Sequence, residues 1–367
     1  MGLLTPEQLV AQRTYIKDLT PNQLIQGMFA IQNCQLGLTR QGKPYLKCLI
    51  ADKTGRLPAR MWSADEAFVQ SLPPQGFVVL EGQTQPYQGQ LQVIVQKLDV
   101  ARPTDDDLPH LLPATDRDVE QMFDELADLV RSVQSPSLRA LVEAYLQDQR
   151  LMSAFKQAPA AVMLHHAYLG GLLEHTLGLV RLADKMLGEY PQLNRDLVLV
   201  GLFIHDLGKC AELVWREGFG YSDEGQLIGH IVRGATWLER KAEACAKAGH
   251  PLPKDALMVL EHIILSHHGK PEFGAARCPS TPEALFVSLL DNLDAKMHMA
   301  ITSTRGLELS EAELNGNFTD KMWALDNVRL SRPDPMAGEC PPPTPAAAAG
   351  SQGGSQQAHP AGSEANA

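Results

Sequence analysis

The sequence predicts two domains of different fold class, an all-β barrel followed by an all-α bundle, with a disordered tail behind them. Five β-rich runs fall within residues 20–101, and helical periodicity dominates residues 117–330. From Arg332 onward the chain is rich in Pro, Ala, Gly, Ser and Gln and too poor in large apolar residues to bury a core. A length of 367 residues also exceeds one ordinary domain.

The first half of the chain is predicted to form a barrel. Turn signals such as RQGK, KTGR and SLPPQ separate the β-rich runs. Between the third and fourth runs, residues 64–72 show a short helical pattern that we expect Ser63 to cap. Five strands with a helix in this place are the layout of an OB-fold barrel, a common oligonucleotide binder. The runs are residues 23–39, 44–52, 56–62, 76–87 and 91–100.

The second half is predicted to be helical. A Pro- and Asp-rich linker precedes it, and its amphipathic segments are clearest at residues 119–133, 137–156, 167–187 and 256–268. We therefore divide the chain into an OB-fold nucleic-acid-binding domain with a short N-terminal extension (1–101), a linker (102–116), a helical domain (117–331) and a disordered tail (332–367).

Charge is distributed unevenly between these parts. The net charge is −11, yet residues 1–102 hold ten Lys and Arg against seven Asp and Glu, so the first part carries +3 and the remainder −14. Such an asymmetry is expected if the mildly basic head contacts a polyanion, or if the acidic part holds cations. Chance surface composition would give the same numbers.

Composition also bears on where the protein works. No apolar run reaches the ~20 residues needed to span a bilayer, and the N-terminal residues lack the layout of a signal peptide. Six cysteines without any C-x-x-C pair argue against a disulfide framework or a thiolate zinc site. We expect a soluble cytoplasmic protein with reduced thiols and no membrane partner.

Histidines concentrate in the helical half, where nine of the twelve lie between residues 165 and 268. A run of eight residues that suit a buried helix ends on His205 and Asp206, a pair that is costly to bury unless something binds it. Two carboxylates, Asp291 and Asp294, follow. His and Asp ligands without thiolates suit Mn, Fe, Mg or Zn, and several histidines with a shared carboxylate can hold two ions.

The order of these residues resembles a known signature. His175, then the doublet of His205 and Asp206, then Asp291, resembles the His…His-Asp…Asp pattern of the HD superfamily of metal-dependent phosphohydrolases. Three further histidines resemble the additional ligands of HD proteins that bind two metals, in which Asp206 would bridge the ions. The resemblance implies a ligand set of His175, His205, Asp206, His230, His267, His268 and Asp291.

Two residues near these ligands are assigned supporting roles. Lys209 follows Asp206 by three residues, where its ammonium would take part in catalysis by meeting a phosphate oxygen. A solvated lysine at the end of a helix is the competing interpretation. Asp294 lies one helical turn beyond Asp291, so we expect it to support a ligand.

Most of the chain resembles a narrower family. The run HHAYLGGLLEHT, together with the OB-like head, is similar to the YhaM-type 3′→5′ exoribonucleases, in which an OB domain precedes an HD domain, over roughly residues 20–325. This resemblance implies hydrolysis of single-stranded RNA to nucleoside 5′-monophosphates, with single-stranded DNA as a further candidate substrate. It also implies two divalent ions per chain, Mn²⁺ first, with Mg²⁺, Fe and Zn²⁺ as alternatives.

Cations and aromatic side chains occur together on and beside the predicted strands of the head. Such a mixture is typical of a groove in which bases stack and phosphates pair with cations. The candidate nucleic-acid-binding residues are Lys43, Tyr45, Arg60, Trp62 and Tyr87. The competing interpretation places Tyr45 and Trp62 in the barrel core.

Two other functions stay open at this point. The same chemistry could act on a free nucleotide or a cyclic dinucleotide, although HHGKPEFGAA lacks the glutamate and the GYP triplet of the HHE…GYP run in cyclic-dinucleotide phosphodiesterases. Alternatively, the protein is a nucleic-acid-binding scaffold with a catalytically silent HD bundle. The sequence also leaves open whether the chain forms a homo-oligomer.

Overall fold

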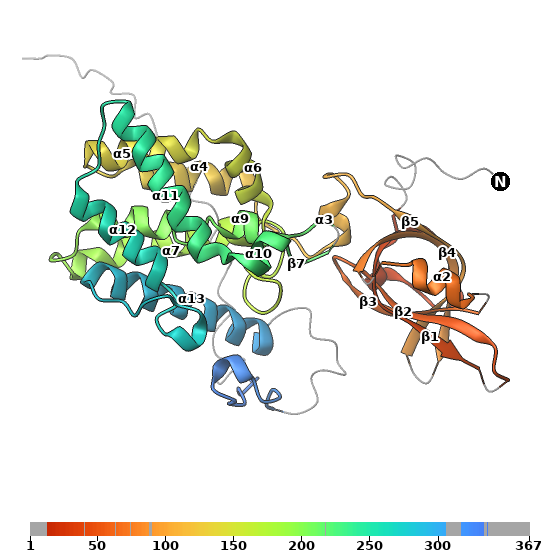
Figure 1. Cartoon of the computed structure of the whole chain (residues 1–367). Coiled ribbons are helices and arrows are strands. Elements are labelled where there is room, and N and C mark those ends of the chain that lie inside the picture. Colours follow the sequence, from red (N-terminus) through yellow and green to blue (C-terminus); the bar gives the residue numbers. More distant parts are fainter. Residues whose placement is uncertain are drawn as a thin grey trace, which may run out of the picture.

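The computed structural model describes residues 13–39, 41–62, 64–73, 75–87, 90–216, 218–305, 317–333 and 336. Figure 1 shows a β-barrel, in red and orange, beside a larger body of helices coloured from yellow to blue. The predicted architecture, barrel first and helical domain second, is confirmed. Of the predicted disordered tail, only residues 332, 333 and 336 are among those described.

The barrel closes through five strands in the order β1-β2-β3-β5-β4. Neighbouring strands pair antiparallel except β3 and β5, which pair in parallel. Helix α2 (Glu66–Ser71) lies between β3 and β4, so the OB-fold prediction is confirmed. The strands are β1 (Leu24–Leu38), β2 (Pro44–Asp52), β3 (Gly55–Met61), β4 (Gln75–Tyr87) and β5 (Gln90–Ala101).

Helix α2 begins at a different cap from the predicted one. The Asp65 carboxylate accepts a hydrogen bond from the backbone nitrogen of Phe68 at 2.8 Å. An aspartate in this position satisfies one of the donors that the start of a helix leaves unpaired. Asp65, and not the predicted Ser63, is therefore the cap; Ser63 itself lies outside the described residues.

The segment predicted as a linker contains a short helix, α3 (Leu108–Leu111), that packs against the barrel. Its Leu108 and Leu111 are buried in one apolar cluster with Ala30, Ala51 and Phe77 of the barrel. Beside them, the backbone oxygen of His110 accepts a hydrogen bond from the backbone nitrogen of Lys53 at 3.3 Å. The connection is thus packed, although its composition is that of a linker.

Among the described residues of the second half helices predominate, and they are accompanied by a two-stranded hairpin that the all-α prediction did not include. The helices are α4 (Val119–Arg131), α5 (Pro136–Leu146), α6 (Gln149–Gln157), α7 (Gly171–Met186), α8 (Arg195–Ile204), α9 (Lys209–Glu212), α10 (Asp223–Leu227), α11 (Gly229–Lys247), α12 (Lys254–Ser266) and α13 (Pro282–Arg305). The hairpin pairs β6 (Leu213–Val214) with β7 (Gly220–Tyr221). Single 3₁₀ turns are η1 (Ile16–Asp18), η2 (Leu187–Glu189), η3 (Pro271–Phe273) and η4 (Trp323–Leu325).

Two predicted helices have other bounds in the structure. The segment 137–156 is divided into α5 and α6, because the Asp148 side chain caps a new helix by accepting from the backbone nitrogen of Leu151 at 3.1 Å. The segment 167–187 becomes helical only at Gly171. Gly170 before it has a φ of 78°, a left-handed conformation that interrupts a helix and suits glycine.

Helix α8 is the centre of the helical domain. It packs against α4, α5, α7, α12 and α13, and every residue from Val198 to Ile204 is buried. This surrounding explains why the run before His205 is apolar on all sides. Among the described residues, no helix has both the length and the apolar character to cross a membrane.

Candidate metal centre and nucleic-acid surface

Most of the predicted metal ligands lie at or near helix ends, whereas Asp291 lies within α13. His205 and Asp206 directly follow α8, and His267 directly follows α12. His230 and His175 lie near the starts of α11 and α7. Because His205 and Asp206 follow the end of α8, the helix itself can stay apolar while the two polar side chains still lie in the interior.

Gly208 allows two of these helix ends to meet. A Cβ atom at this position would lie 2.1 Å from the backbone oxygen of His230, which no side chain tolerates. The glycine in the LGK run after the His-Asp doublet therefore lets the start of α11 approach Asp206 closely.

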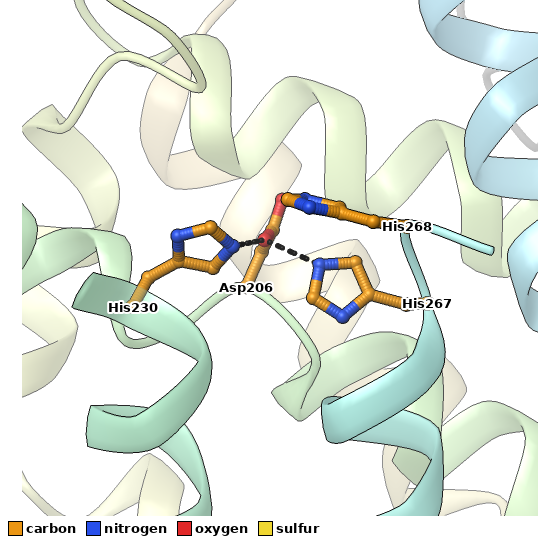
Figure 2. Close-up of side chains that lie close together, drawn as sticks. All are labelled: Asp206, His230, His267 and His268. Carbon is orange, nitrogen blue, oxygen red and sulfur yellow. Dashed lines mark ion pairs between the residues drawn. The ribbon is translucent and has the colours of Figure 1, made fainter. Parts of the chain in front are cut away.

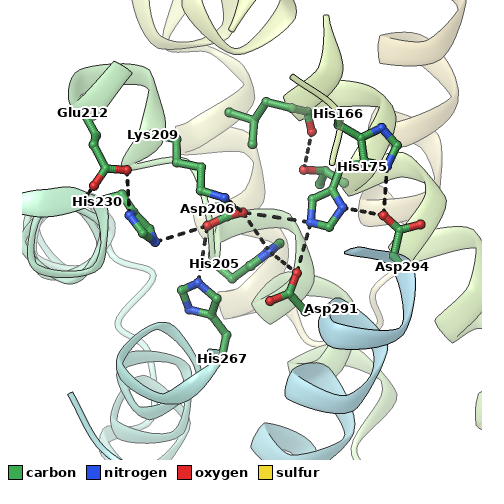
Figure 3. A network of polar contacts seen from close by, with 12 residues as sticks. His166, His175, His205, Asp206, Lys209, Glu212, His230, His267, Asp291 and Asp294 are labelled. Atoms are coloured by element: carbon green, nitrogen blue, oxygen red, sulfur yellow. Dashed lines mark hydrogen bonds and ion pairs between the residues drawn. The ribbon is translucent and has the colours of Figure 1, made fainter. Parts of the chain in front are cut away.

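Asp206 lies at the centre of the cluster, and its two carboxylate oxygens face different histidines. On one side, Oδ1 is 3.3 Å from His267 Nε2 and 3.5 Å from His230 Nε2 (Figure 2). On the other side, Oδ2 is 3.4 Å from His205 Nε2 and 3.9 Å from His175 Nε2 (Figure 3). The carboxylate therefore divides the histidines into two groups that share it.

Asp291 and His268 complete the two groups. Asp291 Oδ1 lies 3.2 Å from His175 Nε2 and 3.9 Å from His205 Nε2. The His268 ring lies beside the other group, with its centroid 4.3 Å from that of His267 and 5.1 Å from that of His230. The structure thus brings together all seven side chains that the sequence nominated as ligands.

Four of the histidines present the same ring nitrogen to the cluster. Their Nδ1 atoms are engaged elsewhere, with Asp294 Oδ2 (His175, 2.7 Å), Leu202 O (His205, 2.7 Å), Glu212 Oε2 (His230, 2.7 Å) and Ile264 O (His267, 2.8 Å). Each of these oxygens is an acceptor, so Nδ1 donates and Nε2 keeps its lone pair when the ring is neutral.

The inward-facing atoms lie near carboxylate oxygens but make no hydrogen bonds. The Nε2 atoms of all four rings and Asp206 Oδ1 are buried without a hydrogen bond. Buried polar atoms normally find a partner, because leaving one unpaired is costly. Convergent imidazole nitrogens around a carboxylate fit a divalent cation, and this donor set suits Mn²⁺, Fe²⁺ or Zn²⁺.

Lys209 is part of this cluster. Its Nζ lies 2.6 Å from Asp206 Oδ2, and the side chain is buried, so it is not the solvated lysine of the competing interpretation. Burial opposes the charge of Lys209, but the attraction of Asp206 outweighs it and raises the pKa of the ammonium. Burial likewise opposes the charge of Asp206, but Lys209 and His205 hold the pKa of that carboxyl well below its usual range.

Two histidines near the cluster remain neutral at physiological pH. Burial is the main cause that lowers the pKa of His268 to about 3, and it lowers the pKa of His165 to about 3 as well. A neutral imidazole is the form that binds metal, so His268 offers a lone pair without first losing a proton.

Some of the groups that orient the predicted ligands were not predicted from the sequence. Glu212 holds Nδ1 of His230 and comes from α9, a helix with no distinguishing pattern. Asp294 occupies the supporting position that its spacing predicted, because it accepts from His175 Nδ1 and also lies 3.0 Å from His166 Nε2. His166 in turn contacts the Tyr168 hydroxyl at 2.7 Å. His166, His175 and Asp294 are close enough to form a metal site, but their facing atoms are already joined by hydrogen bonds.

A cavity of about 540 Å³ opens beside the metal-ligand cluster. Its walls include Lys209, His230, His267, His268 and Asp291. A larger cavity of about 720 Å³ lies between α3, α4 and α6, and none of the predicted ligands lines it. Chemistry at the cluster would therefore use the smaller cavity.

On the barrel, four of the five candidate nucleic-acid residues form two pairs. The Tyr45 and Trp62 rings lie 4.9 Å apart, and the Arg60 guanidinium lies 4.8 Å from the centre of the Tyr87 ring. Trp62 is 49% exposed, which excludes a core position. Lys43 is exposed in the turn before β2, where its backbone nitrogen donates to Thr39 Oγ1.

The barrel and the ligand cluster together define the class of protein, an OB-fold barrel followed by an HD-type metal domain. The sequence matches the HD domain family over residues 172–296, a range that contains all seven predicted ligands. The HD domain and the His and Asp cluster indicate binding of divalent metal.

Comparison with characterised proteins gives the family. The chain is 31% identical to the 3′-5′ exoribonuclease YhaM of Geobacillus sp. (strain WCH70), over 83% of this chain and 90% of the relative. It is 30% identical to the 3′-5′ exoribonuclease YhaM of Bacillus subtilis (strain 168), over 83% of this chain and 93% of the relative. The chain belongs to the YhaM family, as its sequence motifs predicted.

Proposed function

We propose that this chain is a metal-dependent 3′→5′ exoribonuclease that hydrolyses single-stranded RNA to nucleoside 5′-monophosphates. The observation that carries the proposal is the set of four buried Nε2 atoms that converge on the two oxygens of Asp206 without hydrogen-bond partners. Membership of the YhaM family, whose members are named 3′-5′ exoribonucleases, supports the reaction and its direction.

The same geometry supports two ions per chain, with Mn²⁺ as the first candidate. One would be held by His175, His205 and Asp291 with Asp206 Oδ2, and the other by His230, His267 and His268 with Asp206 Oδ1. A pair of divalent ions supplies a hydroxide nucleophile at neutral pH and neutralises charge on the attacked phosphate and the leaving oxygen.

The chain's own residues contribute position and charge. Asp294 and Glu212 fix the rings of His175 and His230 through their Nδ1 atoms. Lys209 places a buried ammonium beside Asp206, where it can turn to an incoming phosphate oxygen. We therefore assign Asp206 and Lys209 the catalytic roles.

The barrel is proposed to hold the strand. Trp62 and Tyr45 offer aromatic faces on which bases stack, and Arg60 and Lys43 supply cations for the phosphates. The +3 charge of residues 1–102, within a chain of −11, supports the same assignment. We assign binding of the strand to residues 1–101 and hydrolysis to residues 117–331. We also propose a cytoplasmic location, which agrees with the five free cysteines among the described residues.

The proposal is tested with purified protein, Mn²⁺ and matched RNA and DNA strands labelled at the 5′ end. We expect a ladder that shortens from the 3′ end, release of nucleoside 5′-monophosphates, and metal titration that saturates at about two ions per chain. Turnover of free nucleotides or cyclic dinucleotides in place of the strand would contradict the proposal. Binding of RNA without turnover would reduce the chain to a scaffold.

A further inference from the structure

The cavity beside the metal centre has a second, aromatic wall. Besides the ligands, it is lined by Tyr221 of β7, Phe273 of η3 and Trp323 of η4. All three rings are exposed, and Trp323 is the most exposed of them at 72%. Large aromatic side chains that surround one cavity and remain exposed to solvent are typical of a binding site for a flat ligand.

Trp323 lies on a segment with defined internal bonds. The backbone nitrogen of Thr319 donates to Leu330 O at 2.9 Å, and that of Met322 donates to Val328 O at 3.0 Å. Leu325, two residues beyond Trp323, is buried. The turn that carries Trp323 is therefore fixed by its own hydrogen bonds and by an apolar anchor, and it presents the indole to the cavity.

The cavity also offers positive charge away from the metal ligands. Lys296 of α13 lines it, is half-buried, and makes no ion pair among the described residues. A half-buried ammonium without a carboxylate partner favours an anionic ligand. The wall also contains the carboxylates of Glu272 and Asp326, so the match to a nucleotide comes from the aromatic rings and Lys296 beside a centre suited to phosphate hydrolysis, and not from the total charge of the cavity.

The size of the cavity suits one nucleotide at the end of a strand. A volume of about 540 Å³ is in the range of sites for single small ligands, about 300–1,000 Å³. An enzyme that removes the last nucleotide must hold one nucleoside beyond the attacked phosphate, while the rest of the strand leaves in another direction. A cavity that is open to solvent and has room for one nucleotide next to the metal centre meets this requirement.

We propose that Trp323 is the platform on which the base of the 3′-terminal nucleotide stacks while its phosphate lies at the metal centre. The inference rests on the proposed exoribonuclease function and adds a specificity-determining residue outside the metal ligands. Lys296 faces the same nucleotide and contributes charge. Stacking accepts every base, so this platform would recognise the presence of a base without selecting its identity.

The experiment compares the full chain with its Trp323→Ala and Trp323→Phe variants on three RNAs. One RNA is unmodified, one lacks only the 3′-terminal base, and one lacks only the penultimate base. Removal of the first nucleotide is measured as kcat/KM with Mn²⁺. The matched control is Phe318→Ala, because Phe318 lies in the same segment and is 55% exposed but does not line the cavity.

We expect the unaltered protein to prefer the base-bearing end over the abasic end by roughly 5- to 150-fold, the range measured for stacking of one base on an aromatic side chain. Trp323→Ala should lower kcat/KM on normal RNA by the same factor and abolish the preference. Trp323→Phe should keep most of it, and Phe318→Ala should behave like the unaltered protein, with metal content equal in all variants.

Three results would overturn the inference. An unaltered protein that degrades RNA but treats base-bearing and abasic ends alike would refute the platform and leave the exoribonuclease function intact. A preference set by the penultimate base would place the stacking one nucleotide away. A protein without activity on any of the three RNAs, despite bound metal, would refute the proposed function itself.

Discussion

The metal centre of the helical domain and the outer surface of the barrel use polar and aromatic side chains in opposite ways. In the helical domain, His175, His205 and Asp206 are almost completely buried, and neighbouring groups fix their orientation. On the barrel, Trp62 and Tyr87 are about half exposed, and their rings lie beside Tyr45 and Arg60, respectively. Buried, oriented ligands suit chemistry, whereas open aromatic faces suit reversible contact with a strand of any sequence.

Because of this difference, the two regions should respond differently to substitution. Removal of one group from a buried set leaves the others unpaired, so its effect exceeds one lost contact. Removal of one exposed group from a surface of several similar contacts should cost little more than that contact. Each prediction below tests one side of this comparison.

The largest effect is expected for Asp206→Ala. Both proposed ions share this carboxylate, so RNA hydrolysis should fall by more than about a hundredfold, since loss of a group that merely orients a ligand already costs about 10–100-fold. RNA binding by the barrel should be unchanged. Activity is measured by release of nucleotide, binding by fluorescence anisotropy, and the exposed Asp255→Ala on α12 serves as the control. Near-normal hydrolysis by folded, metal-loaded Asp206→Ala would disprove the shared-carboxylate arrangement.

Asp294→Ala should have the next largest effect, a loss of about 10–100-fold in affinity for one ion. Asp294 holds His175 Nδ1 at 2.7 Å, so without it the ring can rotate away from the cluster. Glu212→Ala should weaken the other ion by a similar factor, because Glu212 orients His230. Calorimetric titration with Mn²⁺ separates the two. Equal weakening of both ions by each variant would argue against two separate groups of ligands.

Local signals were sufficient for most of the fold. The five strands agree with the predicted runs within one residue at each end, because alternation and turn residues act over a few positions. The split between α5 and α6 was missed because the amphipathic pattern continues across it, and only the capping side chain of Asp148 marks the break. The late start of α7 follows from a single left-handed glycine, Gly170, inside an otherwise helical pattern.

Part of the candidate site could be predicted from the sequence, because polar residues at the end of an apolar, buried run are unusual. The His-Asp doublet after an apolar run is such a signal, but the candidate ligand set came from the resemblance of the whole His…His-Asp…Asp order to the HD signature. The supporting groups carry no such signal, since His175 and Asp294 are 119 positions apart and meet only in the folded chain. Trp323 is a further case, because nothing near it in sequence relates it to the cavity that it lines.

Metal affinity should depend on pH through His175. Burial opposes the charge of this ring, but the neighbouring Asp291 and Asp294 carboxylates outweigh burial and raise the pKa of His175 to about 9 in the metal-free protein. A proton must therefore leave before the ring binds metal, so affinity should rise with pH by about tenfold per unit until about pH 9. Titration in buffers of different ionisation enthalpy should show release of about one proton from this ring near neutral pH.

The same proton affects the stability of the metal-free protein in the opposite direction. Because the pKa of His175 is raised above its ordinary value of 6.5, its contribution to stability is complete below about pH 6.5 and is lost as the pH rises through about 9. RNA binding by the barrel should not follow either trend. Metal affinity that stays constant between pH 7 and 9 would show that His175 is already neutral.

The smallest effect is expected on the barrel, for Arg60→Gln. Its guanidinium lies 4.8 Å from the centre of the Tyr87 ring, and we propose that it contacts one phosphate of the strand. Each phosphate contact with a single strand contributes about 0.7 to the steepness of the plot of log affinity against log salt. The variant should therefore lower this steepness by about 0.7. Its affinity for RNA, relative to that of the unaltered protein, should be roughly fivefold lower at 0.1 M salt than at 1 M salt. Lys97→Gln removes the same charge from β5 but breaks an existing pair with Asp99, 3.3 Å away, and should leave the slope unchanged. Anisotropy titrations across a salt series, with an Asp206→Ala background to prevent hydrolysis, measure both variants. If the two give the same slope, the barrel would attract RNA through its overall charge alone, and the Arg60 and Tyr87 pair would lose its assignment as a contact surface.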